Sequence, residues 1–224
     1  MADCSLSQIS VNRAALYHWF SMAFFAPPTV SDIVDMCDGK AQHLLQALAA
    51  TQDTGSGVAA MFEVLTTDTP AMVASTLGTA YGRLFLGVGA YEVAPPYRSV
   101  YSSAGGLLCQ QATAEMERVL RQHRLRLQDK VKEPSDHLSI QLEVMAQLAL
   151  RFAEVAEDPA SNLIHLQQEQ ADFLAGQLLC WLPAFAQRVI EVDDQGFYAG
   201  LASVLLRVLE QDLAYLDGTL QEMA

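Results

Sequence analysis

The segment PSDHLSIQLEVMAQLALRF, residues 134–152, decides the fold of this chain. Its apolar residues form two neighbouring rows at helical spacing, one of Leu138, Leu142, Met145 and Phe152 and the other of Ile140, Val144 and Leu148. Two adjacent rows predict a helix that is buried over a wide face. Pro134 suits the first helical turn, where a missing N–H loses no partner, and Asp136 in that turn faces the positive end of the helix dipole.

The rest of the chain carries the same spacing. We expect further helices at residues 13–25, 31–36, 42–50, 58–65, 71–86, 105–123, 163–190 and 195–216. Pro27 and Pro28 end the first of these, and Pro183 interrupts the helix at 163–190. Because no segment alternates with period two, the predicted class is all-α: a single globular helical domain over residues 1–224 with about nine to eleven helices. The irregular residues 125–133 offer a hinge that could join two helical lobes.

Composition excludes several classes of function. The 224 residues, of which 51% are hydrophobic and 17% charged, can bury a core without a metal or disulfide and do not describe a disordered protein. A formal net charge of −13 argues against binding to nucleic acid and against docking on anionic lipid, because both need cations on the protein. The same charge suits a cationic partner.

The cysteines and the N-terminus predict the compartment. Cys4, Cys37, Cys109 and Cys180 are widely separated and form no C-x-x-C pair, which indicates free thiols in a reducing environment. The apolar run at residues 14–26 is interrupted by polar residues, so we expect no secretory signal peptide. No apolar run reaches the ~18 residues of a membrane span, so stable membrane insertion is not expected. The chain is predicted to be cytoplasmic.

The search for catalytic and metal motifs finds little. The chain has no phosphate-binding loop, no G-x-S-x-G elbow and no H-E-x-x-H pair. Glu133 and His137 are four residues apart, but two ligands without a third predict no metal site, and no cofactor is expected. Adjacent residues on a helix point about 100° apart, so Asp136 and His137 are not a direct acid–base dyad. The residues favour a helix cap for Asp136 and a hydrogen bond to a neighbouring loop for His137.

A cluster of aromatic residues leads into a proline-containing loop. Its members are Tyr81, Phe85, Tyr91, Tyr97 and Tyr101. Two interpretations stay open, because such residues bury large areas in a core and also line apolar grooves that accept peptides, with their hydroxyls at the rim.

Three segments occur in the order YGRLFLG (residues 81–87), PPYRSVY (95–101) and EPSDHL (133–138). Together they resemble the TorD/DmsD family of molybdoenzyme-specific chaperones, also called redox enzyme maturation proteins. The resemblance extends over most of the chain and is closer to the TorD branch, because tyrosines stand at 81, 97 and 101 where the DmsD branch has tryptophans.

This resemblance implies a function. An all-helical cytoplasmic chaperone, not an enzyme, would bind the twin-arginine signal peptide and the apoprotein of a molybdenum-cofactor oxidoreductase of the trimethylamine N-oxide or dimethyl sulfoxide reductase type. It would support cofactor insertion and delay export, as a monomer or as a homodimer that exchanges helices about residues 125–133. The alternatives are a non-catalytic helical adaptor that binds another protein and, less favoured, a hydrolase that uses Asp136 or His137.

The resemblance also implies a site. The residues that it places at the signal peptide are Phe24, Tyr81, Leu84, Phe85, Pro96, Tyr97, Ser99, Tyr101, Glu133, Pro134, Asp136 and His137.

Overall fold

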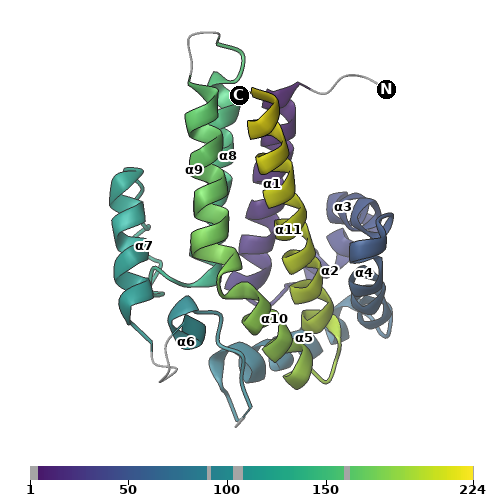
Figure 1. Cartoon of the computed structure of the whole chain (residues 1–224). Coiled ribbons are helices and arrows are strands. Elements are labelled where there is room, and N and C mark those ends of the chain that lie inside the picture. Colours follow the sequence, from purple (N-terminus) through teal and green to yellow (C-terminus); the bar gives the residue numbers. More distant parts are fainter. Residues whose placement is uncertain (1–4, 90–91, 103–107, 159–161, 224) are drawn as a thin grey trace. The chain divides into compact units, whose positions relative to one another are not determined.

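The computed structural model describes residues 5–89, 92–102, 108–158 and 162–223, and within them it is helical. The helices are α1 (Leu6–Phe25), α2 (Val30–Asp38), α3 (Lys40–Ala49), α4 (Gln52–Leu65), α5 (Pro70–Leu86), α6 (Arg98–Ser102), α7 (Gln111–Gln122), α8 (Leu138–Val155), α9 (Leu163–Phe173), the π-helical η1 (Leu174–Leu179), α10 (Leu182–Val192) and α11 (Phe197–Met223) (Figure 1). In the described residues no strand forms, and the one isolated bridge joins Tyr97 and His137. The predicted all-α class is confirmed.

The chain divides into two compact helical units. Unit 1 consists of residues 1–25, 97–181 and 211–224, and unit 2 consists of residues 26–96 and 182–210. The divisions therefore fall after Phe25, Pro96, Trp181 and Glu210, the last of them inside α11. Residues 125–133 lie within unit 1, and a hinge at this segment stays a prediction.

Unit 1 is built around α8, which packs along α1 and also contacts α9 (Figure 1). All seven residues of its two apolar rows are buried, as their spacing predicts, with Leu138, Leu142 and Met145 fully covered. Side-chain hydrogen bonds join α1 to α8 at both ends: Ser21 Oγ donates to the carbonyl of Ser139 at 2.9 Å, and Ser7 Oγ to that of Ala153 at 3.0 Å.

A buried charge cluster joins α1, α9 and α11 within unit 1. The guanidinium of Arg13 binds both carboxylate oxygens of Asp212, at 2.6 and 2.8 Å, and donates to the side-chain oxygen of Gln170 at 2.8 Å. The hydroxyl of Tyr17 donates to Asp212 at 2.6 Å. Burial alone would lower the pKa of Arg13, but the hydrogen bond and charge of Asp212 outweigh it and raise that pKa. Every strong polar group of the cluster therefore has a partner.

Unit 2 has an aromatic core. Tyr81 and Phe85 of α5 pack edge-to-face at 5.1 Å, and Tyr198 of α11 lies 6.0 Å from Tyr81 and 5.1 Å from Phe85, between ring centroids. The hydroxyl of Tyr198 donates to the carbonyl of Leu77 at 3.1 Å, so its polar end is satisfied inside the core. Tyr81 and Phe85, the first two residues of the aromatic cluster, therefore pack in the core of unit 2.

The helix boundaries differ from the sequence prediction where tertiary packing decides them. Helix α4 begins at Gln52, whereas the apolar spacing predicts a helix only over residues 58–65. Close packing at Gly57 accounts for the earlier start of α4. A Cβ atom on Gly57 would lie 2.9 Å from the carbonyl oxygen of Gly200. Two glycines let the backbones of α4 and α11 approach closely, and this packing offsets the low helix propensity of the segment.

The stretch Leu163–Val192, which holds α9, η1 and α10, is by length and composition apolar enough to cross a membrane. Within this stretch, α9 buries Gln167 and Gln170 in unit 1. The stretch also carries the charged residues Glu169, Asp172 and Arg188. Buried polar side chains such as those of Gln167 and Gln170 are typical of a helix that packs in a protein core. The α-helix of this stretch is interrupted from Leu174, where η1 begins, and not at Pro183 as predicted. Pro183 takes the second position of α10.

Candidate functional site

Asp136 lies fully buried in the turn before α8. One carboxylate oxygen accepts the backbone N–H of Ser99 at 2.8 Å, and the other accepts the hydroxyl of Thr113 at 2.7 Å. The side-chain amide of Gln141 donates to the Asp136 carbonyl at 2.7 Å. The residue thus holds α6 and α7 against the start of α8. Both oxygens are used in these bonds, so the carboxylate is placed as a structural acceptor.

His137 caps α8. Its Nδ1 accepts the backbone N–H of Ser139 at 3.1 Å, which assigns the ring proton to Nε2 in the neutral form. The predicted roles were therefore wrong in detail: His137 is the helix cap, and Asp136 makes the hydrogen bonds to neighbouring segments. The prediction that Pro134 opens the helix was also wrong, because residues 134–137 form a turn closed by a hydrogen bond from His137 N–H to the Pro134 carbonyl.

Two aromatic rings enclose the His137 imidazole. Tyr97 packs edge-to-face on it with ring centroids 4.9 Å apart, and Phe25 of α1 lies at 6.4 Å in the same manner. Burial lowers the pKa of His137 to about 4, although the charges of Glu133 and Asp136 act in the opposite direction. The imidazole is therefore neutral at physiological pH.

This pKa predicts a pH dependence of stability. An unfolded histidine titrates near pH ~6.5, so between pH ~6.5 and 4 the unfolded chain binds a proton that folded His137 does not. The free energy of unfolding therefore keeps the full contribution of His137 above that pH window. It decreases by about 3 kcal/mol in total as the pH falls through the window. We expect His137→Asn, which keeps a cap acceptor, to flatten the pH profile of the free energy of unfolding in urea titrations. His43→Asn, at an exposed site, is the control, and equal slopes for wild type and His137→Asn would contradict the assignment.

The second and third sequence segments meet around this turn. The hydroxyl of Tyr97 donates to Glu133 at 2.5 Å, and the guanidinium of Arg98 binds Glu115 at 3.0 Å. Tyr101 stacks on Trp181 with centroids 5.6 Å apart. Segments far apart in sequence thus form one hydrogen-bonded corner, called here the motif corner: residues 97–101 and 133–137.

The predicted site residues fall into two groups. Unit 1 contains Phe24, Tyr97, Ser99, Tyr101, Glu133, Pro134, Asp136 and His137. Unit 2 contains Tyr81, Leu84, Phe85 and Pro96, all of which are buried. Phe24 is also fully buried, and Tyr91 lies outside the described residues. Contact of these residues with a signal peptide stays a prediction.

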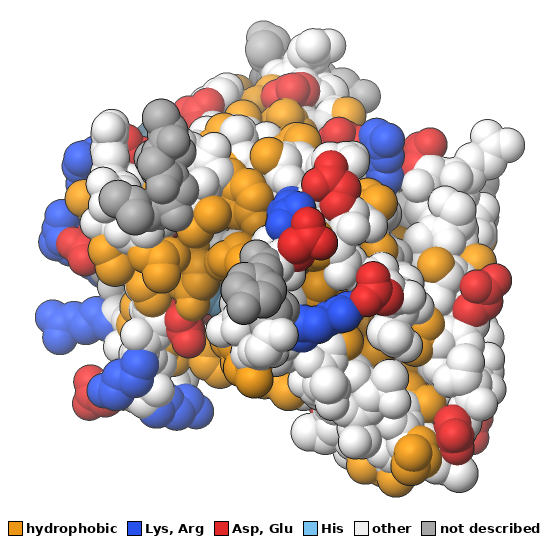
Figure 2. Space-filling model, turned by 90° about the horizontal axis from the view of Figure 1, so that it is seen from below, with side chains coloured by type: hydrophobic (Ala, Val, Ile, Leu, Met, Phe, Trp, Pro, Cys, Tyr) orange, Lys and Arg blue, Asp and Glu red, His pale blue; other side chains and the backbone are white. Residues whose placement is uncertain are grey.

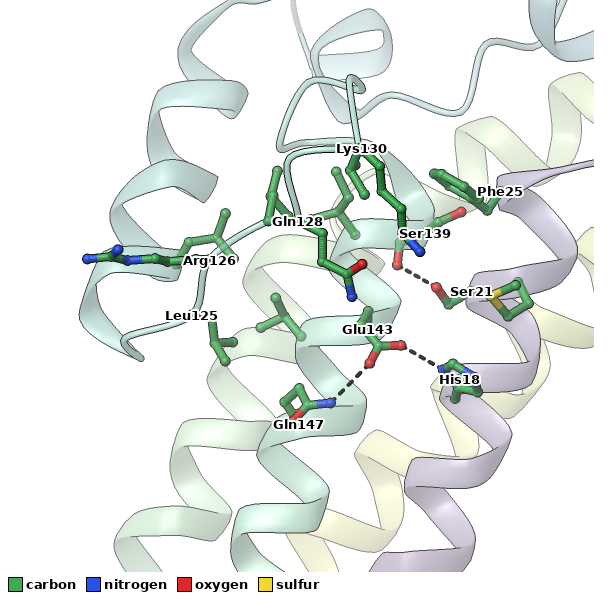
Figure 3. Close-up of a pocket in the computed structure, with 16 residues that line it drawn as sticks. His18, Ser21, Phe25, Leu125, Arg126, Gln128, Lys130, Ser139, Glu143 and Gln147 are labelled. Carbon is green, nitrogen blue, oxygen red and sulfur yellow. Dashed lines mark hydrogen bonds and ion pairs between the residues drawn. The ribbon is translucent and has the colours of Figure 1, made fainter.

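A groove of about 610 Å³ opens in unit 1 beside the motif corner. One wall is α1, a second is the first half of α8, and the third is the connection after α7, residues 125–131 (Figure 3). Phe25, which contacts His137, and Ser139, which His137 caps, both line it. Met22 and Phe25 leave 54% and 40% of their surfaces exposed there, an apolar surface that a ligand could cover.

The charges of the groove are unevenly placed. Among the described residues that line it, Glu143 is the one carboxylate, and Arg126 and Lys130 lie on the connection. In Figure 3 Lys130 extends over the groove toward Ser139, whereas Arg126 points away from it. Six of the thirteen lysines and arginines fall within residues 118–132, and Figure 2 shows cations gathering along this edge of unit 1.

Sequence reasoning missed the groove, although a signal for it exists in α1. His18, Ser21, Met22 and Phe25 follow the i, i+3, i+4, i+7 pattern of one helix face, and all four line the groove. The pattern alone could not separate this exposed face from the buried face that carries Phe24. That distinction needs the position of residues 125–131.

The described residues offer no metal centre. Among residues 5–89, 92–102, 108–158 and 162–223, no group of three or more His, Cys, Asp and Glu side chains could hold a metal ion. Cys37, Cys109 and Cys180 are free thiols, and Cys4 lies outside the described residues.

Comparison with known proteins gives the family of this chain. Residues 41–187 match the family described as nitrate reductase delta subunit. The chaperone protein TorD of Vibrio cholerae serotype O1 (strain ATCC 39541 / Classical Ogawa 395 / O395) is 32% identical over 218 residues, 97% of this chain and 97% of the relative. TorD of Psychrobacter sp. (strain PRwf-1) is 30% identical over 92% of this chain and 91% of its own length. TorD of Vibrio parahaemolyticus is 28% identical over 92% and 95%.

The family match and these relatives identify the chain as a chaperone, a non-catalytic class of protein. As its three sequence segments predict, the chain belongs to the TorD family of chaperones, which serve the maturation of molybdoenzymes.

Proposed function

We propose that this chaperone binds the twin-arginine signal peptide and the apoprotein of a molybdenum-cofactor oxidoreductase of the trimethylamine N-oxide or dimethyl sulfoxide reductase type. In this role it supports cofactor insertion in the cytoplasm and delays export until insertion is complete. The observation that carries the proposal is the apolar groove beside the motif corner in a chain that is similar to TorD chaperones along almost its whole length.

The groove has the properties that a signal peptide requires. Its volume of about 610 Å³ lies in the range of ligand sites, and its apolar residues come from all three walls, among them Phe25, Leu125 and Ile140. Burying one large apolar side chain contributes about 1.5–3 kcal/mol, and micromolar binding needs about 8 kcal/mol. A few apolar side chains of the peptide therefore supply the main part of the affinity.

The motif corner supports the groove. Asp136 fixes the start of α8, and the neutral imidazole of His137 lies between Tyr97 and Phe25. The neutral ring lies buried next to Phe25, where an imidazolium would be strongly unfavourable because its charge would be unpaired. The corner thus positions Phe25 at the groove.

A binding measurement tests the proposal. We expect a twin-arginine signal peptide to bind the full chain in isothermal titration calorimetry, and Phe25→Ala to weaken binding about tenfold by removing apolar contact area. Leu150→Ala is the matched control, because Leu150 is also a partly exposed apolar residue of unit 1 but does not line the groove. No binding of any twin-arginine peptide, or of the apo-reductase, would refute the proposed function. If Phe25→Ala binds the peptide with unchanged affinity, the peptide does not bind in this groove.

A further inference from the structure

The two ends of the groove differ in charge. Lys130 extends over it on the side of Phe25 and Ser139, and Glu143 lies further along α8, beside His18 and Gln147 (Figure 3). A ligand that carries positive charge at one end only would meet attraction at one end of the groove and repulsion at the other.

Glu143 is held in a way that leaves it available. Its Oε2 lies 2.8 Å from Nδ1 of His18, and its Oε1 accepts the side-chain amide of Gln147 at 3.0 Å. The side chains of His18 and Glu143 remain 61% and 40% exposed. Such an exposed pair contributes little to stability, so a stronger partner can displace both neighbours at small cost. An arginine is such a partner, because its guanidinium can bind both carboxylate oxygens at once.

We propose that Glu143 is the receptor for the arginine pair of the signal peptide and that it sets the direction of the bound peptide. The arginines lie at the His18 and Gln147 end, and the uncharged apolar segment that follows them runs toward Phe25 and Ser139. Lys130 disfavours the reverse orientation. This inference rests on the proposed function and adds to it a specificity-determining residue.

Calorimetry with three peptides tests the role of Glu143: one with the Arg-Arg pair, one with Lys-Lys and one with Gln-Gln, otherwise identical. We expect wild type to bind the Arg-Arg peptide about tenfold more tightly than the Gln-Gln peptide, with Lys-Lys between them, since one charge-assisted bidentate contact is involved. Glu143→Gln should weaken binding of the Arg-Arg peptide about tenfold and so remove this preference. Glu154→Gln, an exposed site on the same helix outside the groove, should keep the preference.

A charge exchange separates recognition from misfolding. Glu143→Lys should bind a peptide with Glu-Glu in place of Arg-Arg more tightly than wild type does. If wild type binds the Arg-Arg peptide but Glu143→Gln retains the same preference, the inference is wrong and the proposed function stands. If wild type binds none of the peptides and no apo-reductase, both the role of Glu143 and the proposed function are wrong.

The direction has its own readout. A photo-crosslinker placed just before the arginines should react with the part of α1 near His18, and one at the end of the apolar segment should react near Phe25. The reverse pattern of crosslinks, mapped by mass spectrometry, would overturn the proposed orientation even if Glu143 proved to be required.

Discussion

Asp212→Ala lowers the free energy of unfolding by about 3–5 kcal/mol, because it leaves the buried guanidinium of Arg13 without its counter-ion. The side chain of Arg13 is only 11% exposed, so water cannot replace the carboxylate. The hydroxyl of Tyr17 loses its acceptor in the same change. Urea unfolding followed by circular dichroism measures the effect.

Glu210→Ala provides the control on the same helix. Glu210 pairs with Arg207 at 2.7 Å, but both side chains are about half exposed, so the loss should lie between 0 and about 1 kcal/mol. Equal losses for Asp212→Ala and Glu210→Ala would show that the cluster of Arg13 does not support the packing of α1, α9 and α11.

Asp136→Ala costs about 3–5 kcal/mol of the free energy of unfolding, the second largest effect that we expect. The change removes two hydrogen bonds to a carboxylate and leaves the buried N–H of Ser99 and the hydroxyl of Thr113 without that acceptor. Asp136→Asn should cost clearly less, because its amide oxygen can still accept one bond and the Thr113 hydroxyl can accept from its NH₂ group.

The comparison of these two variants identifies what Asp136 does. A catalytic carboxylate would lose its activity in both variants, whereas a structural acceptor keeps most of its role as asparagine. We therefore expect Asp136→Asn to retain peptide affinity and Asp136→Ala to lose it together with stability. Peptide affinity that is abolished in a well-folded Asp136→Asn protein would contradict the structural role.

This structural role explains why a hydrogen-bonding motif can serve a binding protein. Asp136 and His137 do not face a substrate as an acid–base pair; they join α6, α7 and α8 and place Phe25 and Ser139 at the groove. The groove proposed as the binding surface lies next to the motif corner and includes Phe25, which contacts His137.

Much of the fold follows from local pattern. The two apolar rows of α8 and the stripe of Tyr198, Leu201, Leu205 and Leu209 on α11 are buried as their spacing predicts. Helix α5 also runs over Pro70–Leu86 in agreement with its periodicity, despite two glycines. These features need only the 3.6-residue repeat, which the side chains display directly.

The sequence by itself determined the all-α class, the main helices and, through three ordered segments, the family of this protein. Only the tertiary structure decided that α8 begins at Leu138, that His137 rather than Asp136 is its cap, and that Phe25 rather than Phe24 faces the groove. The physical reason is distance along the chain. Caps and helix faces are settled by hydrogen bonds and contacts between segments such as Ser99 and Asp136, 37 residues apart, and local periodicity carries no information about these partners.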